Sequence, residues 1–264
     1  MPHGHSWFDV LLGTFYENVE AVAHVLGWPF NDEGKTWYQG DHIGVQHVWG
    51  SVLVLIAVGI VAFGAYRKIR DTHQAILPEA KLSVRTFVEI IVSITYGMMS
   101  DMMGPKAAKY FLPLIGTCAF LIFFSNVIGL IPGFLPPTDN LRTTGAYAII
   151  IFVLTHVYGV REHGIAYFKH FLGPIIKWYA LPLMILMLGI EVISHIVRPI
   201  TLAVRLAANM TADHLVLTIF IGLVPFVVPI PMYMLGVIVV TVQTLVFCLL
   251  SSVYISMAIA HEEH

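Results

Sequence analysis

The chain has 264 residues, of which 58% are hydrophobic and only 11% are charged. Soluble domains carry about 25% charged residues, so the composition predicts an integral membrane protein with too little polar sequence for a separate soluble domain. The formal net charge of -2 gives no indication of nucleic-acid binding.

Residues 1–40 form a mixed segment that holds three tryptophans and a single basic residue, Lys35. Tryptophan favours the membrane interface. Residues 43–66 are the first apolar run of spanning length, and four residues with three positive charges, Arg67 to Arg70, follow it directly. Positive charge after a span marks the cytoplasmic side. We therefore expect residues 1–40 outside and residues 41–264 in one membrane domain.

Residues 80–103 are too polar to span a membrane. Their apolar residues recur at steps of three and four, which is typical of an amphipathic helix that lies in the interface. Gly104-Pro105 is expected to end this helix. The methionines at 98–103 are interpreted as apolar surface rather than as a binding site.

Two further spans are predicted at 110–131 and 143–160. Prolines close the first of them, and PPTDN at 136–140 is expected to be an outside loop. His156 lies within the second, where we interpret it as a packing residue. Cys118 and Cys248 lie in apolar runs and are expected to be small buried hydrophobes rather than a disulfide.

The last two apolar regions, 174–223 and 232–260, are too long to stand upright in a bilayer. The first would extend about 70 Å as one helix, so it must be strongly tilted, kinked at Pro199, or divided into two spans. We predict an all-α integral membrane protein with five spanning helices plus one interfacial amphipathic helix, the last two spanning helices long and strongly tilted.

The basic residues support one orientation of this topology. Ten of them fall on the predicted cytoplasmic side, and only Lys35 and Arg142 fall outside. The N-terminus is therefore expected outside and the C-terminus in the cytoplasm.

A polar stripe runs along residues 191–214 in the middle of the long apolar region. At about 100° per residue, six polar side chains share roughly a quarter of the helix circumference. They are Glu191, His195, Arg198, Arg205, Asn209 and Asp213. Ionisable residues inside a membrane usually face a protein interior or a water-filled path, so the stripe predicts a route for a proton or cation.

A simpler interpretation is that two ordinary helix ends meet at Pro199 and that Arg198 only reaches out to the headgroups. Arg205 argues against it, because apolar residues flank this arginine for several turns on both sides.

Three stretches resemble subunit a of the F-type ATP synthase, the membrane stator of its rotor. Residues 110–134 (YFLPLIGTCAFLIFFSNVIGLIPGF) resemble the first signature span of that family, and residues 198–215 (RPITLAVRLAANMTADHL) resemble its highly specific Arg-x-x-x-Asn helix. Residues 242–258 (VQTLVFCLLSSVYISMA) resemble its last helix. The likeness covers nearly all of the chain after residue 40.

The resemblance implies that Arg205 is the essential arginine that faces a ring of proteolipid (c-type) subunits, with Asn209 and Gln243 as its polar neighbours. It also implies that Glu191 and Ser194 belong to a cytoplasmic half-channel. Protons would enter by one half-channel, neutralise a ring carboxylate, and leave by a second, offset half-channel. An arginine between the two favours the ionised ring carboxylate and blocks a continuous proton wire, and arginine keeps its own proton.

The family further implies partners and a location. The partners are the proteolipid ring, the peripheral stalk (b-type) subunits, the lipid bilayer and, indirectly, the soluble catalytic head. The location is the bacterial inner membrane. We expect no catalytic site within this chain, no metal and no cofactor.

The chain departs from the family pattern at its outer half-channel. Many bacterial members have glycine and an acid where this chain has Asp213 and His214, and a histidine at the position of Gly236. We hypothesise that Asp213 and His214 are the outer relay and that Gly236 leaves room for water. His195, on the stripe, and Tyr254, which matches a residue of the last helix, complete the predicted proton path.

Two other functions remain open on the residues alone. A self-contained ion-coupled secondary transporter or channel is the main alternative, although inverted repeats and two broken helices are not evident. An intramembrane enzyme is the third, although the chain has no HExxH or GxSxG motif.

Overall fold

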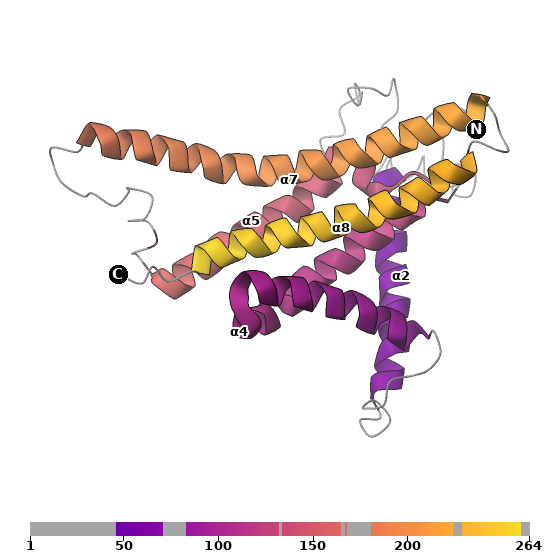
Figure 1. Ribbon diagram of the computed structural model, residues 1–264, viewed down its shortest axis with the longest axis horizontal. Helices are drawn as coiled ribbons and strands as arrows, with labels where there is room; N and C mark the ends of the chain where they lie inside the picture. Colours follow the sequence, from indigo (N-terminus) through magenta and orange to yellow (C-terminus); the bar gives the residue numbers. More distant parts are fainter. Residues whose placement is uncertain are drawn as a thin grey trace, which may run out of the picture. The chain divides into compact units, whose positions relative to one another are not determined.

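A computed structural model describes residues 46–70, 83–131, 134–164, 167, 181–223 and 229–259. All secondary structure within these ranges is helical (Figure 1). The elements are α2 (Gln46–Ile69), α4 (Val84–Gly129), the 3-10 turn η1 (Pro137–Asp139), α5 (Leu141–His163), α7 (Leu181–Leu223) and α8 (Pro229–Ile259). The predicted N-terminal segment and the terminal histidines lie outside the described residues.

Five helices of the described part are long and apolar enough to cross a membrane, which confirms the predicted number. The first, third and fifth predicted spans fall on α2, α5 and α8, and each end agrees within one helical turn. The first half of α4 covers the predicted interfacial helix, and its second half covers the span predicted at 110–131.

The break inside α4 lies where the sequence predicts it. Gly104 has φ 78° and ψ 160°, which is not helical, and the helices on either side run in different directions (Figure 1). Glycine adopts this positive φ at little cost because it has no Cβ. Pro105 follows at the first position of the second helix, where a missing N–H is tolerated.

Pro199 does not break α7. The helix continues through it over 43 residues, about 65 Å along the axis. This continuity supports one long helix over the alternative in which the region is divided into two spans at Pro199.

The described residues belong to two compact units. The first is drawn from Met1–Val88, Phe120–Asn140 and Met210–Thr241, and the second from Glu89–Ala119, Leu141–Asn209 and Val242–His264. Residues of α4, α7 and α8 therefore belong to both units.

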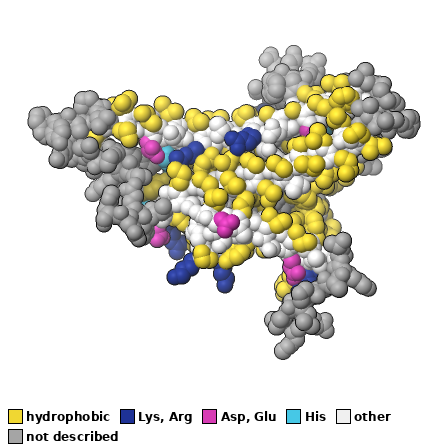
Figure 2. All heavy atoms as spheres, in the orientation of Figure 1, with side chains coloured by type: hydrophobic (Ala, Val, Ile, Leu, Met, Phe, Trp, Pro, Cys, Tyr) yellow, Lys and Arg dark blue, Asp and Glu magenta, His cyan; other side chains and the backbone are white. Residues whose placement is uncertain are grey.

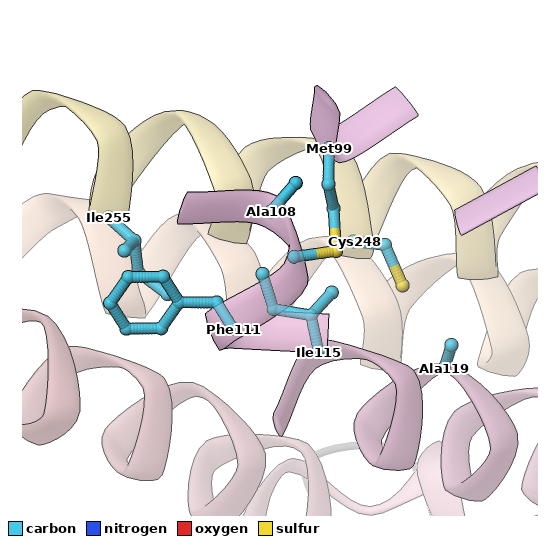
Figure 3. Packing of buried hydrophobic residues seen from close by; sticks show 7 residues of the cluster. All are labelled: Met99, Ala108, Phe111, Ile115, Ala119, Cys248 and Ile255. Atoms are coloured by element: carbon cyan, nitrogen blue, oxygen red, sulfur yellow. The ribbon is translucent and has the colours of Figure 1, made fainter. Parts of the chain in front are cut away.

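The second unit has a core between α4 and α8, shown from close by in Figure 3. It consists of Met99, Ala108, Phe111, Ile115, Ala119, Cys248 and Ile255. The small residues let the two helices approach closely, as is common in membranes. Met99 is fully buried, so the interpretation of the methionines as surface was wrong for this residue. Cys118 and Cys248 are both free and buried, as predicted.

The first unit packs α2 against the segment before α5. A Cβ on Gly50 would lie 2.8 Å from Cγ of Pro137, so α2 approaches η1 as closely as a glycine allows. Thr138 is fully buried and donates a hydrogen bond of 2.6 Å to Oδ1 of Asn126. The PPTDN stretch is therefore a packed part of this unit.

Large apolar side chains cover much of the surface. On α2, the exposed fractions of Leu55 and Ile60 are 58% and 67%. The face in Figure 2 is mostly hydrophobic, with few charged side chains. Exposed apolar surface on this scale requires lipid or partner chains.

Candidate functional site

Arg205 lies on α7 with its side chain exposed on this chain. Asn209, one turn later and also exposed, donates from Nδ2 to Oε1 of Gln243 on α8 at 2.8 Å. Gln243 is buried. The structure thus joins the two predicted neighbours of Arg205, and α8 orients the amide that lies next to the arginine.

Glu191 and His195 are in contact four residues apart on α7, and both are half-buried. Nδ1 of His195 lies 2.9 Å from the backbone carbonyl oxygen of Glu191 and 3.4 Å from its Oε1. A carbonyl oxygen can only accept a hydrogen bond, so Nδ1 carries a proton. Ser194 is half-buried on the same turn.

Arg198 and Tyr254 form a cation–π contact between α7 and α8. Cζ of Arg198 lies 5.5 Å from the centroid of the Tyr254 ring, within the range in which the ring face attracts a cation. The structure therefore brings Tyr254, predicted from the last helix, beside the polar stripe.

His156 of α5 lies beside His195, a contact that the sequence analysis did not predict. The two ring centroids are 5.2 Å apart. The His156 ring also contacts the Phe152 ring in a tilted arrangement, with the centroids 4.2 Å apart, so it does pack as expected, but it also has a second imidazole as a neighbour. The position of His156 within an apolar span could have indicated this contact, because an ionisable residue inside a membrane usually has a polar partner.

Asp213 and Gly236 are neighbours in the first unit. A Cβ on Gly236 would lie 3.2 Å from Oδ2 of Asp213 and 2.7 Å from Cδ2 of Leu130. The expectation that Gly236 leaves space for water was wrong. The space beside it holds the Asp213 carboxylate and the Leu130 side chain instead.

His214 is half-buried, and the carboxylates of Asp213 and Asp139 both act on it electrostatically. Thr211, two residues before Asp213, donates a hydrogen bond to Oδ1 of Asp139. Asp139 in η1 thus connects to α7, which the sequence did not predict.

A second polar pair in the same unit was also missed. Asn126 is 1% exposed and accepts a hydrogen bond from Thr138 at Oδ1, while its Nδ2 has no hydrogen-bond partner among the described residues. Ser125 is fully buried, and its hydroxyl also has no hydrogen-bond partner among the described residues. Buried polar atoms of this kind are usually satisfied by ordered water. The adjacent polar residues Ser125 and Asn126 within the apolar run 110–131 could have indicated a buried polar contact.

Metal binding finds no support in the described ranges. No three His, Cys, Asp or Glu side chains in them lie close enough together to hold a metal ion. The two polar groups, around Glu191 and His195 in one unit and around Asp213 and His214 in the other, can instead accept and donate protons.

Comparison with known proteins gives a family for this arrangement. The family described as ATP synthase A chain matches residues 48–256. ATP synthase subunit a of Sorangium cellulosum (strain So ce56) is 45% identical over 234 residues, which cover 88% of this chain and 90% of that protein. ATP synthase subunit a 2 of Syntrophotalea carbinolica is 46% identical over 215 residues, 81% and 85% of the two chains. The subunit a of Geobacter sulfurreducens is 41% identical over 211 residues, 80% and 85% of the two chains.

Proposed function

This chain belongs to the ATP synthase A chain family, and we propose that it is the proton-translocating stator subunit of a rotary ATP synthase. As a member of that family it is a membrane component of an ATP synthase complex and takes part in the ion transport coupled to ATP synthesis. The proposal adds two offset half-channels, separated by Arg205, that connect the two sides of the membrane to the proteolipid ring.

The observation that carries the proposal is the exposure of Arg205 in the middle of α7. The exposed surface of α7 also carries large apolar side chains, such as Ile200 and Val204, which are 53% and 45% exposed, as expected for a helix that meets lipid or partner chains. A guanidinium in contact with lipid alone is costly. A partner that presents a carboxylate at the same depth would stabilise it, and a ring of proteolipid subunits with one acid each supplies that group repeatedly.

The inner half-channel is proposed along Glu191, Ser194 and His195, next to Arg198 and Tyr254. Glu191 precedes Arg205 by about 21 Å along α7. In this proposal a proton travels between the cytoplasmic side and the ring within one unit of the chain, and the contact of Glu191 with His195 at 3.4 Å supports the first step of that path.

The outer half-channel is proposed along Asp213 and His214. Asp213 follows Arg205 by eight residues, about 12 Å along α7. The Asp213 carboxylate lies beside Gly236, the position at which the family resemblance implies a titratable side chain in many bacterial members. This contact supports the hypothesis that Asp213 and His214 of α7 are the outer relay.

Purification of the tagged chain in mild detergent tests the function. A stator should co-elute with small two-helix proteolipids, with stalk subunits and with a soluble head that hydrolyses ATP. Isolation of the chain alone, with ion-coupled transport after reconstitution by itself, would instead establish the secondary transporter.

The orientation is tested separately. We expect the N-terminus on the periplasmic side of the inner membrane and the C-terminus in the cytoplasm, because five spans separate them. A reporter tag after His264 should be labelled only after the cells are opened, and labelling from the periplasm of intact cells would contradict the five-span arrangement. A tag before Met1 should give the opposite pattern and serves as the control.

A further inference from the structure

A cavity of about 20 Å³ lies in the second unit among α5, α7 and α8. Its lining includes Thr155 and His156 of α5, His195 and Arg198 of α7, and Tyr254 of α8. A space of about 10–15 Å³ holds one water if polar partners surround it. The cavity is large enough, and five of its lining residues are polar.

The two histidines at the cavity have the same hydrogen-bond arrangement. Nδ1 of His156 lies 2.9 Å from the carbonyl oxygen of Phe152, and Nδ1 of His195 lies 2.9 Å from that of Glu191. Each Nδ1 therefore carries a proton. In the neutral ring, Nε2 is then the nitrogen that takes up a further proton.

The difference between the two rings is a carboxylate. Nδ1 of His195 also lies 3.4 Å from Oε1 of Glu191. Among the described residues, Nδ1 of His156 has the backbone carbonyl oxygen of Phe152 as its partner and no carboxylate. His195 can therefore accept a proton at one nitrogen and release one to an acid at the other. His156 can exchange a proton only through Nε2.

We propose that His156 and His195 form a proton-loading pair for the inner half-channel, in which His156 stores a proton and His195 passes it to Glu191. This inference rests on the proposed function. During ATP synthesis, when protons leave the ring for the cytoplasm, protonated His156 releases a proton from Nε2 to the cavity water, and that water passes a proton on to Nε2 of His195. The Nδ1–H bond of His195 then breaks, and that proton goes to the Glu191 carboxylate, about 6 Å nearer the cytoplasmic end of α7. The reverse sequence carries a proton from Glu191 into the pair during ATP-driven pumping, which is the direction in which the pair is loaded.

The charges around the pair limit it to one proton. The two rings lie 5.2 Å apart and repel each other when both carry a positive charge, and the Arg198 guanidinium lines the same cavity as a further positive charge. The Glu191 carboxylate adds a negative charge 3.4 Å from Nδ1 of His195, and the phenols of Tyr167 and Tyr254 also lie beside the pair. A proton held by one ring can therefore pass to the other through the cavity.

A packing role for His156 makes a different prediction. The His156 ring contacts Phe152 in a tilted arrangement and lies edge-on to Tyr167, with centroids 6.0 Å apart. If packing were the whole role of His156, the His156→Phe complex would pump protons at the normal rate at every pH.

The test is ATP-driven proton pumping by the whole complex in inverted membrane vesicles, whose outer face is the cytoplasmic one. His156→Gln, His156→Phe and His195→Gln are compared with the unaltered complex at pH 6 and pH 8, per assembled complex. The ordinary pKa of an imidazole is about 6.5, so the two pH values lie on either side of it. Proton capture should limit pumping only at the higher pH, where protons are scarce. At pH 8 we expect each variant to pump about tenfold more slowly, because positioned acid–base groups contribute about 10²-fold or more and cavity water replaces part of it. At pH 6 we expect rates within about twofold of the unaltered complex, because protons are then plentiful.

His163→Gln, a histidine in the last turn of the same helix, is the matched control and should leave both rates unchanged. Full activity of His156→Phe at pH 8, or an equal loss at both pH values, would overturn the proposal. If the glutamine forms do not assemble, the asparagine forms undergo the same comparison. Arg205→Ala separates the two ideas, since normal pumping by that variant would refute the stator function itself, whatever the histidine variants do.

Discussion

Replacing Arg205 with alanine is expected to abolish ATP-driven proton pumping while the complex still assembles. Without the cation, a ring carboxylate that leaves the lipid has no partner that favours its ionised form, so it keeps its proton. The barrier between the half-channels is also lost, so we expect a passive proton leak. Both effects are measured in vesicles, pumping by a pH-sensitive dye and leakage after an imposed pH gradient.

Arg205→Lys should fail as well, because lysine is a compact, strongly hydrated charge that lacks the forked guanidinium and loses its proton more easily when buried. Arg161→Ala provides the control, since Arg161 is an exposed arginine in the last turn of α5. That variant should pump normally. Normal pumping by either assembled Arg205 variant would refute the role assigned to this residue.

Asp213→Asn is expected to reduce proton-driven ATP synthesis at least about tenfold, because a positioned proton-transfer group contributes about 10²–10⁴-fold and water replaces part of it. The amide keeps the shape of the side chain beside Gly236 but cannot carry a proton between water and ring. Synthesis in proteoliposomes across pH measures the effect. Asp101→Asn, which alters an exposed acid on α4, should have no effect. If Asp213→Asn, His214→Ala and the double variant all kept the normal rate and pH profile, these residues would be interfacial rather than a relay.

Gly236→Leu should produce a similar loss by a steric route. The first added carbon would already lie 2.7 Å from Leu130 and 3.2 Å from the Asp213 carboxylate, and the rest of the leucine must displace one of them. Gly236→Ala is expected to be mild, because both contacts are the ends of flexible side chains. Gly59→Leu, at a glycine on α2 with nothing within 4 Å, controls for glycine replacement in a helix. Normal synthesis by assembled Gly236→Leu would contradict the proposed position of the relay.

The number of spans, the break at Gly104 and the polar face of α7 could be predicted from the sequence. Each depends on local properties of the chain, namely the length of an apolar run, the conformational freedom of glycine, and the period of the helix. Arg205 and Asn209 share a face for the same reason. The continuity through Pro199 was left open, because a proline can either kink a helix or be accommodated within it.

The contacts between helices were decided only by the tertiary structure. His156 beside His195, Asp139 bound to Thr211, and the Asp213 carboxylate beside Gly236 each join residues from different elements. The periodicity of one helix shows which side chains share its face, but it carries no information on the neighbour that this face meets. Helix packing sets that neighbour through close contacts and hydrogen bonds that depend on both surfaces together. For this reason the helices and the polar stripe could be predicted from local patterns, whereas the pairing of the stripe with α5, η1 and α8 required the folded chain.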